Sequence, residues 1–161
     1  MSPVSISVIM PARNASETIA AAIDSILRQT FTDLELIIVD DNSTDNTAEI
    51  AREYAVADER VRVCALPDDD PERIGWNGTN INAGWAARNH GMERAESEWI
   101  TFQDSDDASL LNRIRVQHDF AVQYGSSHVC VDWQKYTPQY LGKRLDVERI
   151  RTEHSEESLV K

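Results

Sequence analysis

Apolar residues along this chain gather in short continuous runs, which alternate with longer stretches where apolar residues recur every three or four positions. The continuous runs have the length and the β-branched composition of strands. They predict strands at residues 4–10, 34–40, 60–66, 98–103 and 127–133. The periodic stretches predict helices within residues 14–30, 43–55, 83–95 and 110–125.

Start and stop signals accompany several of these helices. Asn14 with Glu17 fits a capping box, which predicts that the first helix starts just after the first strand. Gly125 is a typical residue for the end of the last helix. The helical period predicts that the first two helices face inward through Ile19, Ile23, Ile26, Leu27, Thr47, Ile50, Ala51 and Tyr54.

The alternation of strands and helices predicts an α/β fold built from βαβ units. Such units give a mostly parallel sheet with helices on both faces, and strands buried on both faces are apolar throughout. At 161 residues the chain is expected to form one domain. The periodicity fades after Trp133, so residues 134–161 are expected to be a C-terminal extension or tail.

The charge of the chain limits its partners. A net charge of −12 argues against nucleic acid, which requires a basic face. No apolar run approaches the length of a membrane span, and the N-terminus lacks the order of a signal peptide. We therefore expect a cytoplasmic protein that reaches the inner face of a membrane only through partners. Cys64 and Cys130 lie in apolar stretches and are expected to be buried free thiols.

Carboxylates follow two of the predicted strands directly. Asp40 and Asp41 end one strand, and Asp104, Asp106 and Asp107 follow another. Ligands of parallel sheets bind beyond the carboxyl ends of the strands, so both groups are expected to face one crevice. Asp-x-Asp at such a place suits Mg2+ or Mn2+, although acidic residues also cap helices. An EF-hand calcium loop is excluded at residues 39–47 because its glycine and glutamate are absent.

A series of motifs occurs in order along residues 4–107. They are Pro-x-x-Asn after the first strand, Gln-Thr-Phe before the second, Val-Asp-Asp-x-Ser, Ala-Arg-Asn-x-Gly and Asp-x-Asp-Asp. In this series the chain resembles the family 2 glycosyltransferases, which have the GT-A fold. The resemblance implies a Rossmann-like, three-layer αβα domain over residues 1–133 that binds a nucleotide sugar.

The resemblance also implies a site. Asp41 would accept a hydrogen bond from the base, for which uracil is suitable, and Arg88 would reach the nucleotide or its phosphates. Asp106 would be the main ligand of Mn2+ or Mg2+, with Asp104 as the second or at the ribose. The full set implied for the nucleotide is Pro11, Ala12, Arg13, Asp41, Arg88, Asp104 and Ser105.

The function implied by the resemblance is a metal-dependent, inverting glycosyltransferase that uses a UDP-sugar or similar donor. A nucleotide-sugar-binding module without transfer activity is one alternative. An aspartyl phosphotransferase with Asp104 as nucleophile is another, but it leaves Pro11–Asn14 and Asp40–Asp41 unexplained.

Family members carry an acceptor groove and an acidic catalytic base after the Asp-x-Asp motif. Here the residues after Asp107 predict one helix, the strand at 127–133 and a tail, so the sheet is expected to be truncated after its fifth strand. The acceptor half would be absent, and the uncovered side would invite a partner or self-association. Asp132 is the only late carboxylate expected near the crevice, and a solvated strand-end aspartate is its alternative interpretation. The acceptor, whether a glycan, a lipid or a protein, is not indicated.

Overall fold

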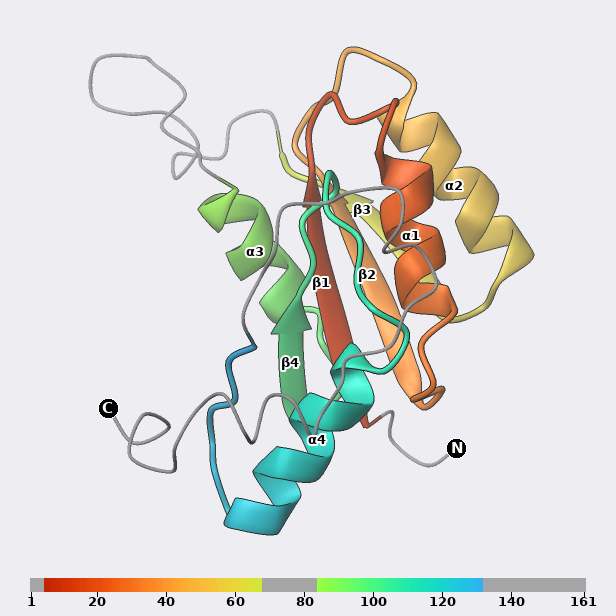
Figure 1. Cartoon of the computed structure of the whole chain (residues 1–161). Helices are drawn as coiled ribbons and strands as arrows, with labels where there is room; N and C mark the ends of the chain where they lie inside the picture. The colour runs from red at the N-terminus through yellow and green to blue at the C-terminus, as the bar shows by residue number, and fades with distance from the viewer. Residues whose placement is uncertain (1–4, 68–83, 132–161) are drawn as a thin grey trace. The chain divides into compact units, whose positions relative to one another are not determined.

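The computed structural model describes residues 5–67 and 84–131, and the chain divides into two compact units. The first unit comprises Met1–Leu27 and Thr32–Ser109, and the second comprises Arg28–Phe31 and Leu110–Lys161. The first unit contains the sheet and is shown in Figure 1 from red to green.

The described part of the first unit is a parallel sheet with helices on both faces. Its elements are β1 (Ile6–Ala12), α1 (Ile19–Leu27), β2 (Leu34–Asp40), α2 (Thr47–Ala57), β3 (Val61–Ala65), α3 (Trp85–Met92) and β4 (Trp99–Phe102). The strand order is β3-β2-β1-β4, and β1 pairs in parallel with both β2 and β4. The predicted α/β fold with a parallel sheet is confirmed.

The order of the strands creates a switch point. From β1 the chain builds outward through β2 to β3, and it then returns through α3 to place β4 on the other side of β1. At such a point the connections after two neighbouring strands diverge and leave a crevice at their carboxyl ends. The crevice here lies beyond β1 and β4.

The helices cover the sheet from both sides, with α3 on one face and α1 and α2 on the other (Figure 1). Ile9, Ile37 and Val39 pack against α3 in one buried cluster. Gly91 permits this contact, because a Cβ there would lie only 2.4 Å from Ile9 Cγ2. Side chains alternate along a strand, so the fully buried Val8, Met10, Leu36 and Ile38 belong to the opposite face.

The predicted capping box at Asn14 is wrong. Asn14 has a left-handed backbone with φ of 48°, and α1 begins only at Ile19. Its Oδ1 accepts a hydrogen bond from the Thr44 backbone N–H at 2.8 Å, in the loop after β2. The side chain therefore joins two loops and does not cap its own helix.

The described part of the second unit contains α4 (Arg113–Tyr124) and the short segment 28–31. The Gln29 side chain donates to Leu110 O at 2.7 Å and accepts from Ile114 N at 3.1 Å. Gly125, with φ of 60°, ends α4 as predicted. No helix in the described ranges 5–67 and 84–131 is long and apolar enough to cross a membrane.

The predicted fifth strand is not formed where the structure describes it. Residues 127–131 have no strand pairing, and His128 and Cys130 are exposed. Both cysteines are free, but the prediction that Cys130 is buried is wrong, and Cys64 is only partly buried. The Val129 carbonyl accepts from the Gln117 side chain at 3.0 Å, which is a contact with α4 and no part of a ladder. A β-branched run is apolar enough for a strand, but without a neighbour to pair with it stays irregular. Asp132 and Trp133 lie outside the described residues.

Candidate functional site

A cleft of about 210 Å³ lies at the carboxyl ends of β1 and β4. Every site residue predicted from the sequence lines it, except Asp132, which lies outside the described residues. Gly84 and Ala87 line it as well and were not predicted. The full lining is Pro11, Ala12, Arg13, Asp41, Gly84, Ala87, Arg88, Asp104, Ser105 and Asp106.

One wall of the cleft is the pair formed by Arg13 and Asp41. Arg13 Nη1 lies 3.3 Å from Asp41 Oδ2, and the Arg13 side chain is 45% exposed whereas that of Asp41 is buried. The Asp41 backbone N–H donates to Ala12 O at 2.8 Å, which extends the β1–β2 ladder to the edge of the cleft. A buried carboxylate beside an exposed guanidinium can offer a ligand an acceptor and a donor side by side.

Asp40 has the structural role that the sequence left open for both aspartates of the pair. Its two carboxylate oxygens lie 3.3 and 3.4 Å from the backbone N of Ser43, so it closes the turn before α2. Asp41 lines the cleft, where its Oδ2 pairs with Arg13. The turn role therefore belongs to Asp40, and Asp41 is the member of the pair that faces the cleft.

The two loops after β1 and β2 are joined by side chains. Besides the bond between Asn14 and Thr44, Asp45 Oδ2 accepts from the Ser16 backbone N at 3.1 Å, and Thr47 Oγ1 accepts from the backbone N of Ala15. The hydrogen bonds from the side chain and the backbone of Thr47, and then those from Ser16, hold the pKa of Asp45 well below its usual range. This network fixes the relative positions of the segments that carry Arg13 and Asp41.

The opposite wall is an acidic turn after β4. One carboxylate oxygen from each of Asp104, Asp106 and Asp107 lies within 4.8 Å of the others, among the residues that the structure describes. Burial, and then the charges of Asp106 and Asp104, raise the pKa of Asp107. Converging carboxylate oxygens are the donors that hard divalent cations prefer, so the residues present fit Mg2+ or Mn2+.

Arg88 lies between these walls on the first turns of α3. Its guanidinium forms an ion pair with Asp104, whereas Glu93 forms an ion pair with Arg94. Gly84 precedes α3 with φ of 79°, and a Cβ there would lie 2.8 Å from Arg88 Nη1. Gly84 therefore leaves room for the guanidinium to reach the turn. The result is a cation beside a carboxylate cluster, an arrangement that suits a phosphorylated ligand.

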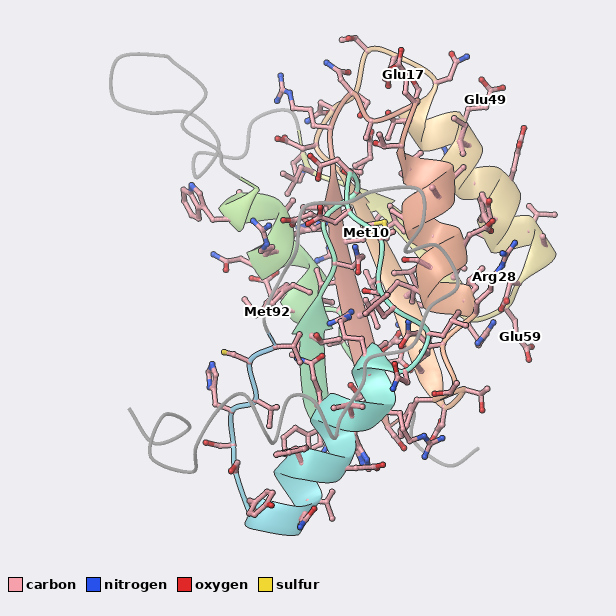
Figure 2. The ribbon with its side chains drawn as sticks, in the orientation of Figure 1. Met10, Glu17, Arg28, Glu49, Glu59 and Met92 are labelled. Carbon is pink, nitrogen blue, oxygen red and sulfur yellow. The ribbon has the colours of Figure 1, made fainter. Side chains whose placement is uncertain are left out.

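Figure 2 labels Glu49 on α2 and Met92 on α3, the helices on opposite faces of the sheet. A larger and more open depression of about 1170 Å³ runs along α2, where Glu49, Glu53 and Val56 contribute to its lining. Its lining includes Asp40, so the prediction that Asp40 faces the same crevice as Asp41 is wrong; it contains none of the residues that the resemblance implied for the nucleotide or the metal. We therefore place the candidate site at the smaller cleft, where the oppositely charged groups converge.

Comparison with known proteins identifies relatives of the same kind. The family model "Glycosyl transferase family 2" matches residues 7–75 and 79–158, beyond the last motif recognised in the sequence. The E. coli UDP-Glc:α-D-GlcNAc-diphosphoundecaprenol β-1,3-glucosyltransferase WfgD is 36% identical over 114 residues, which are 70% of this chain and 39% of WfgD. The match covers about two fifths of the length of WfgD and of a Haemophilus influenzae glycosyltransferase, and a smaller share of other curated relatives.

Solved structures agree with the fold. S. aureus TarS in complex with UDP superposes with a TM-score of 0.61 at 28% identity, covering 75% of this chain and 33% of that one. Glucosyl-3-phosphoglycerate synthase from Mycobacterium tuberculosis, in complex with Mn2+, UDP and glucosyl-3-phosphoglycerate, gives a TM-score of 0.51 at 26% identity over 73% and 39% of the two chains. The family match, the parallel sheet and the strand-end cleft lead to one conclusion: this chain belongs to glycosyltransferase family 2 and has a GT-A-like fold.

Proposed function

We propose that residues 1–133 form the nucleotide-sugar-binding half of a metal-dependent, inverting glycosyltransferase whose donor is a UDP-sugar. The observation that supports this most strongly is the convergence of Arg13, Asp41, Arg88 and the acidic turn on one cleft. TarS and the mycobacterial synthase, with which the fold superposes, are complexed with UDP in their structures.

In this proposal Asp41 recognises the base. A carboxylate accepts hydrogen bonds and cannot donate one, so it favours a base that presents an N–H at its edge. Uracil has such a group at N3, whereas cytosine has an unprotonated nitrogen there. Pro11, Ala12 and Arg13 would border the base and ribose from the end of β1, and UDP is therefore expected to bind more tightly than CDP.

The other wall would hold the diphosphate end of the donor. Asp106 and Asp104 would bind Mn2+ or Mg2+, while Ser105 and Arg88 would lie beside the ribose and the phosphates. A bound cation offsets the repulsion among the carboxylates and stabilises negative charge on the leaving nucleoside diphosphate. Asp104 has Arg88 as its partner, which leaves Asp106 as the main candidate ligand.

Transfer requires more than a donor site. An inverting displacement needs a base that takes the proton of the acceptor hydroxyl, and an acceptor held in line with the anomeric carbon. Asp132 is the candidate for this base, and the acceptor belongs to a glycan, lipid or protein of unspecified structure. We propose that residues 134–161 form an extension or tail and that residues 1–133 do not include the acceptor half. We also propose that the protein is cytoplasmic and reaches the inner face of a membrane through partners. This part of the proposal is supported by the sequence.

Isothermal titration calorimetry tests the donor site directly. UDP titrated into the protein with Mn2+ should bind with measurable heat, and a chelator should weaken the binding strongly. Asp106→Asn should mimic the chelator, whereas Glu49→Gln, a loss of one carboxylate on the surface of α2, should not. Equal UDP affinity with and without metal would refute the metal-dependent donor site. Donor hydrolysis and transfer measured alongside should be weak.

A further inference from the structure

Gln103 is the residue between β4 and the acidic turn, and it has no role in the function described above. Its side chain is nearly enclosed, because the residue is only 6% exposed. Its backbone N–H donates to Ile9 O at 3.0 Å and so continues the β1–β4 ladder by one residue. The sheet therefore fixes the backbone position from which the Gln103 side chain extends.

The amide of Gln103 spans the acidic turn. Its Nε2 donates to Asp104 O at 3.1 Å and to Asp107 O at 2.9 Å, the carbonyls at the two ends of the turn. The backbone N–H of Asp107 donates to Asp104 O at 3.2 Å, which closes the turn on itself. The amide therefore donates both of its hydrogen bonds to the backbone of the turn that carries the three carboxylates.

The acceptor of the same amide is anchored as well. The hydroxyl of Ser109 donates to Gln103 Oε1, and the backbone N–H of Ser109 donates to Ser25 Oγ at 3.0 Å. Ser25 in turn donates to Ala22 O at 2.7 Å within α1. A chain of hydrogen bonds therefore connects the acidic turn to a helix of the core, with Gln103 at its centre.

The hydrogen bonds of Gln103 act against the electrostatic repulsion among the carboxylates of the acidic turn. Three carboxylates with oxygens within 4.8 Å repel one another, and a free turn would relax by moving them apart. A buried amide that holds both ends of the turn keeps them together before any cation arrives. Cation sites are strengthened when supporting hydrogen bonds hold the ligands in place in advance.

We propose that Gln103 is a positioning residue that preorganises the Asp104–Asp107 turn for a divalent cation. The inference rests on the proposed function insofar as that function places the cation at this turn. It concerns a residue that touches neither the cation nor the nucleotide, since its amide bonds only to backbone carbonyls and Ser109.

The test measures Mn2+ binding to the full chain by the electron paramagnetic resonance signal of free Mn2+, without nucleotide. Gln103→Met keeps the length of the side chain and removes its three hydrogen bonds. We expect its Mn2+ affinity to fall by roughly 10- to 100-fold. In the presence of a chelator, the variant and the parent should have the same UDP affinity, because the substitution does not alter Arg13 and Asp41.

Gln29→Met is the matched control. Gln29 is also buried, 3% exposed, and also bonds to backbone on both sides, but it belongs to the second unit and does not line the cleft. Both variants should lower thermal stability, and only Gln103→Met should lower Mn2+ affinity. A merely structural role of Gln103 would give the two variants the same Mn2+ affinity.

The outcomes separate the two claims. A folded Gln103→Met with the Mn2+ affinity of the parent overturns the positioning role alone. A parent that binds no Mn2+ overturns this inference together with the cation in the proposed function. If Gln103→Met does not fold, Ser109→Ala decides, since it removes the hydroxyl that donates to Gln103 Oε1 and keeps Gln103 itself: weaker Mn2+ binding supports the role, and unchanged binding overturns it.

Discussion

Neighbouring residues of the same type have different roles at this site. Asp40 and Asp41 end β2 together, yet Asp40 contacts the backbone of Ser43 whereas Asp41 pairs with Arg13 in the cleft. The side chains of adjacent strand residues point to opposite sides, so only one of two successive aspartates can face a given ligand. The sequence identified the pair as important, and the division of roles follows from the structure.

Replacement of Asp41 tests its role in base recognition. Asp41→Ala should weaken UDP binding by about 1.5–3 kcal/mol, the typical contribution of a hydrogen bond to a charged group. The fold should persist, because the partner Arg13 is 45% exposed and can be hydrated when it loses the carboxylate. Calorimetry with UDP and circular dichroism on the same samples measure both effects. An Asp41→Ala variant with the UDP affinity of the parent would show that Asp41 has no part in binding.

At the scale of elements, the pattern of apolar residues predicted most of the fold. Strand and helix positions in residues 5–67 and 84–125 agree with it, although β1 continues through Pro11 to Ala12, where a stop was expected. Proline removes one backbone donor but is compatible with an extended backbone, so it does not have to end a strand. The gathering of site residues also followed from the sequence, because parallel strands bring their carboxyl ends to one edge.

What the sequence did not predict depends on contacts between distant residues. Asn14 looks like a helix cap locally, but its partner is Thr44 in another loop. Gln103 has no motif of its own, and its importance is visible only from its bonds to Asp104, Asp107 and Ser109. Within residues 127–131, the described part of the expected strand, no strand forms, because apolar composition does not supply a pairing partner.

The close packing of α3 on the sheet makes Gly91 a second test at this scale. A Cβ at Gly91 would lie 2.4 Å from Ile9 Cγ2 and 3.2 Å from Val39 Cγ2, both in the rigid core, so α3 would have to move outward. Gly91→Ala should lower the free energy of unfolding by about 1–3 kcal/mol, as overpacking usually does. It should also weaken UDP binding, since Arg88 is carried on the same helix.

Chemical denaturation and UDP titration measure these two effects of Gly91→Ala. Met92→Ala is the control, because Met92 is the next residue of α3 and is exposed. It should leave both quantities close to those of the parent. A Gly91→Ala variant as stable as the parent would mean that α3 is held less tightly than its contacts with Ile9 and Val39 indicate.

The whole chain combines a well-defined donor fold with a short remainder. Its match covers about two fifths of the length of WfgD, and its family match continues to residue 158. In the first unit, a sheet with its own core carries the candidate site entirely within residues 11–106. We therefore expect nucleotide binding from this chain, and we expect its transfer activity to be weak.

The location of the cation that binds together with UDP tests this account most directly. At 18.2 kDa the protein suits amide NMR, and Mn2+ added with UDP broadens the signals of amides near the cation. The account predicts broadening centred on residues 104–107, extending to residues 11–13 and 84–88, with Mg2+ and UDP as the diamagnetic reference. Broadening centred instead on the depression along α2, at residues 48–56, would contradict it.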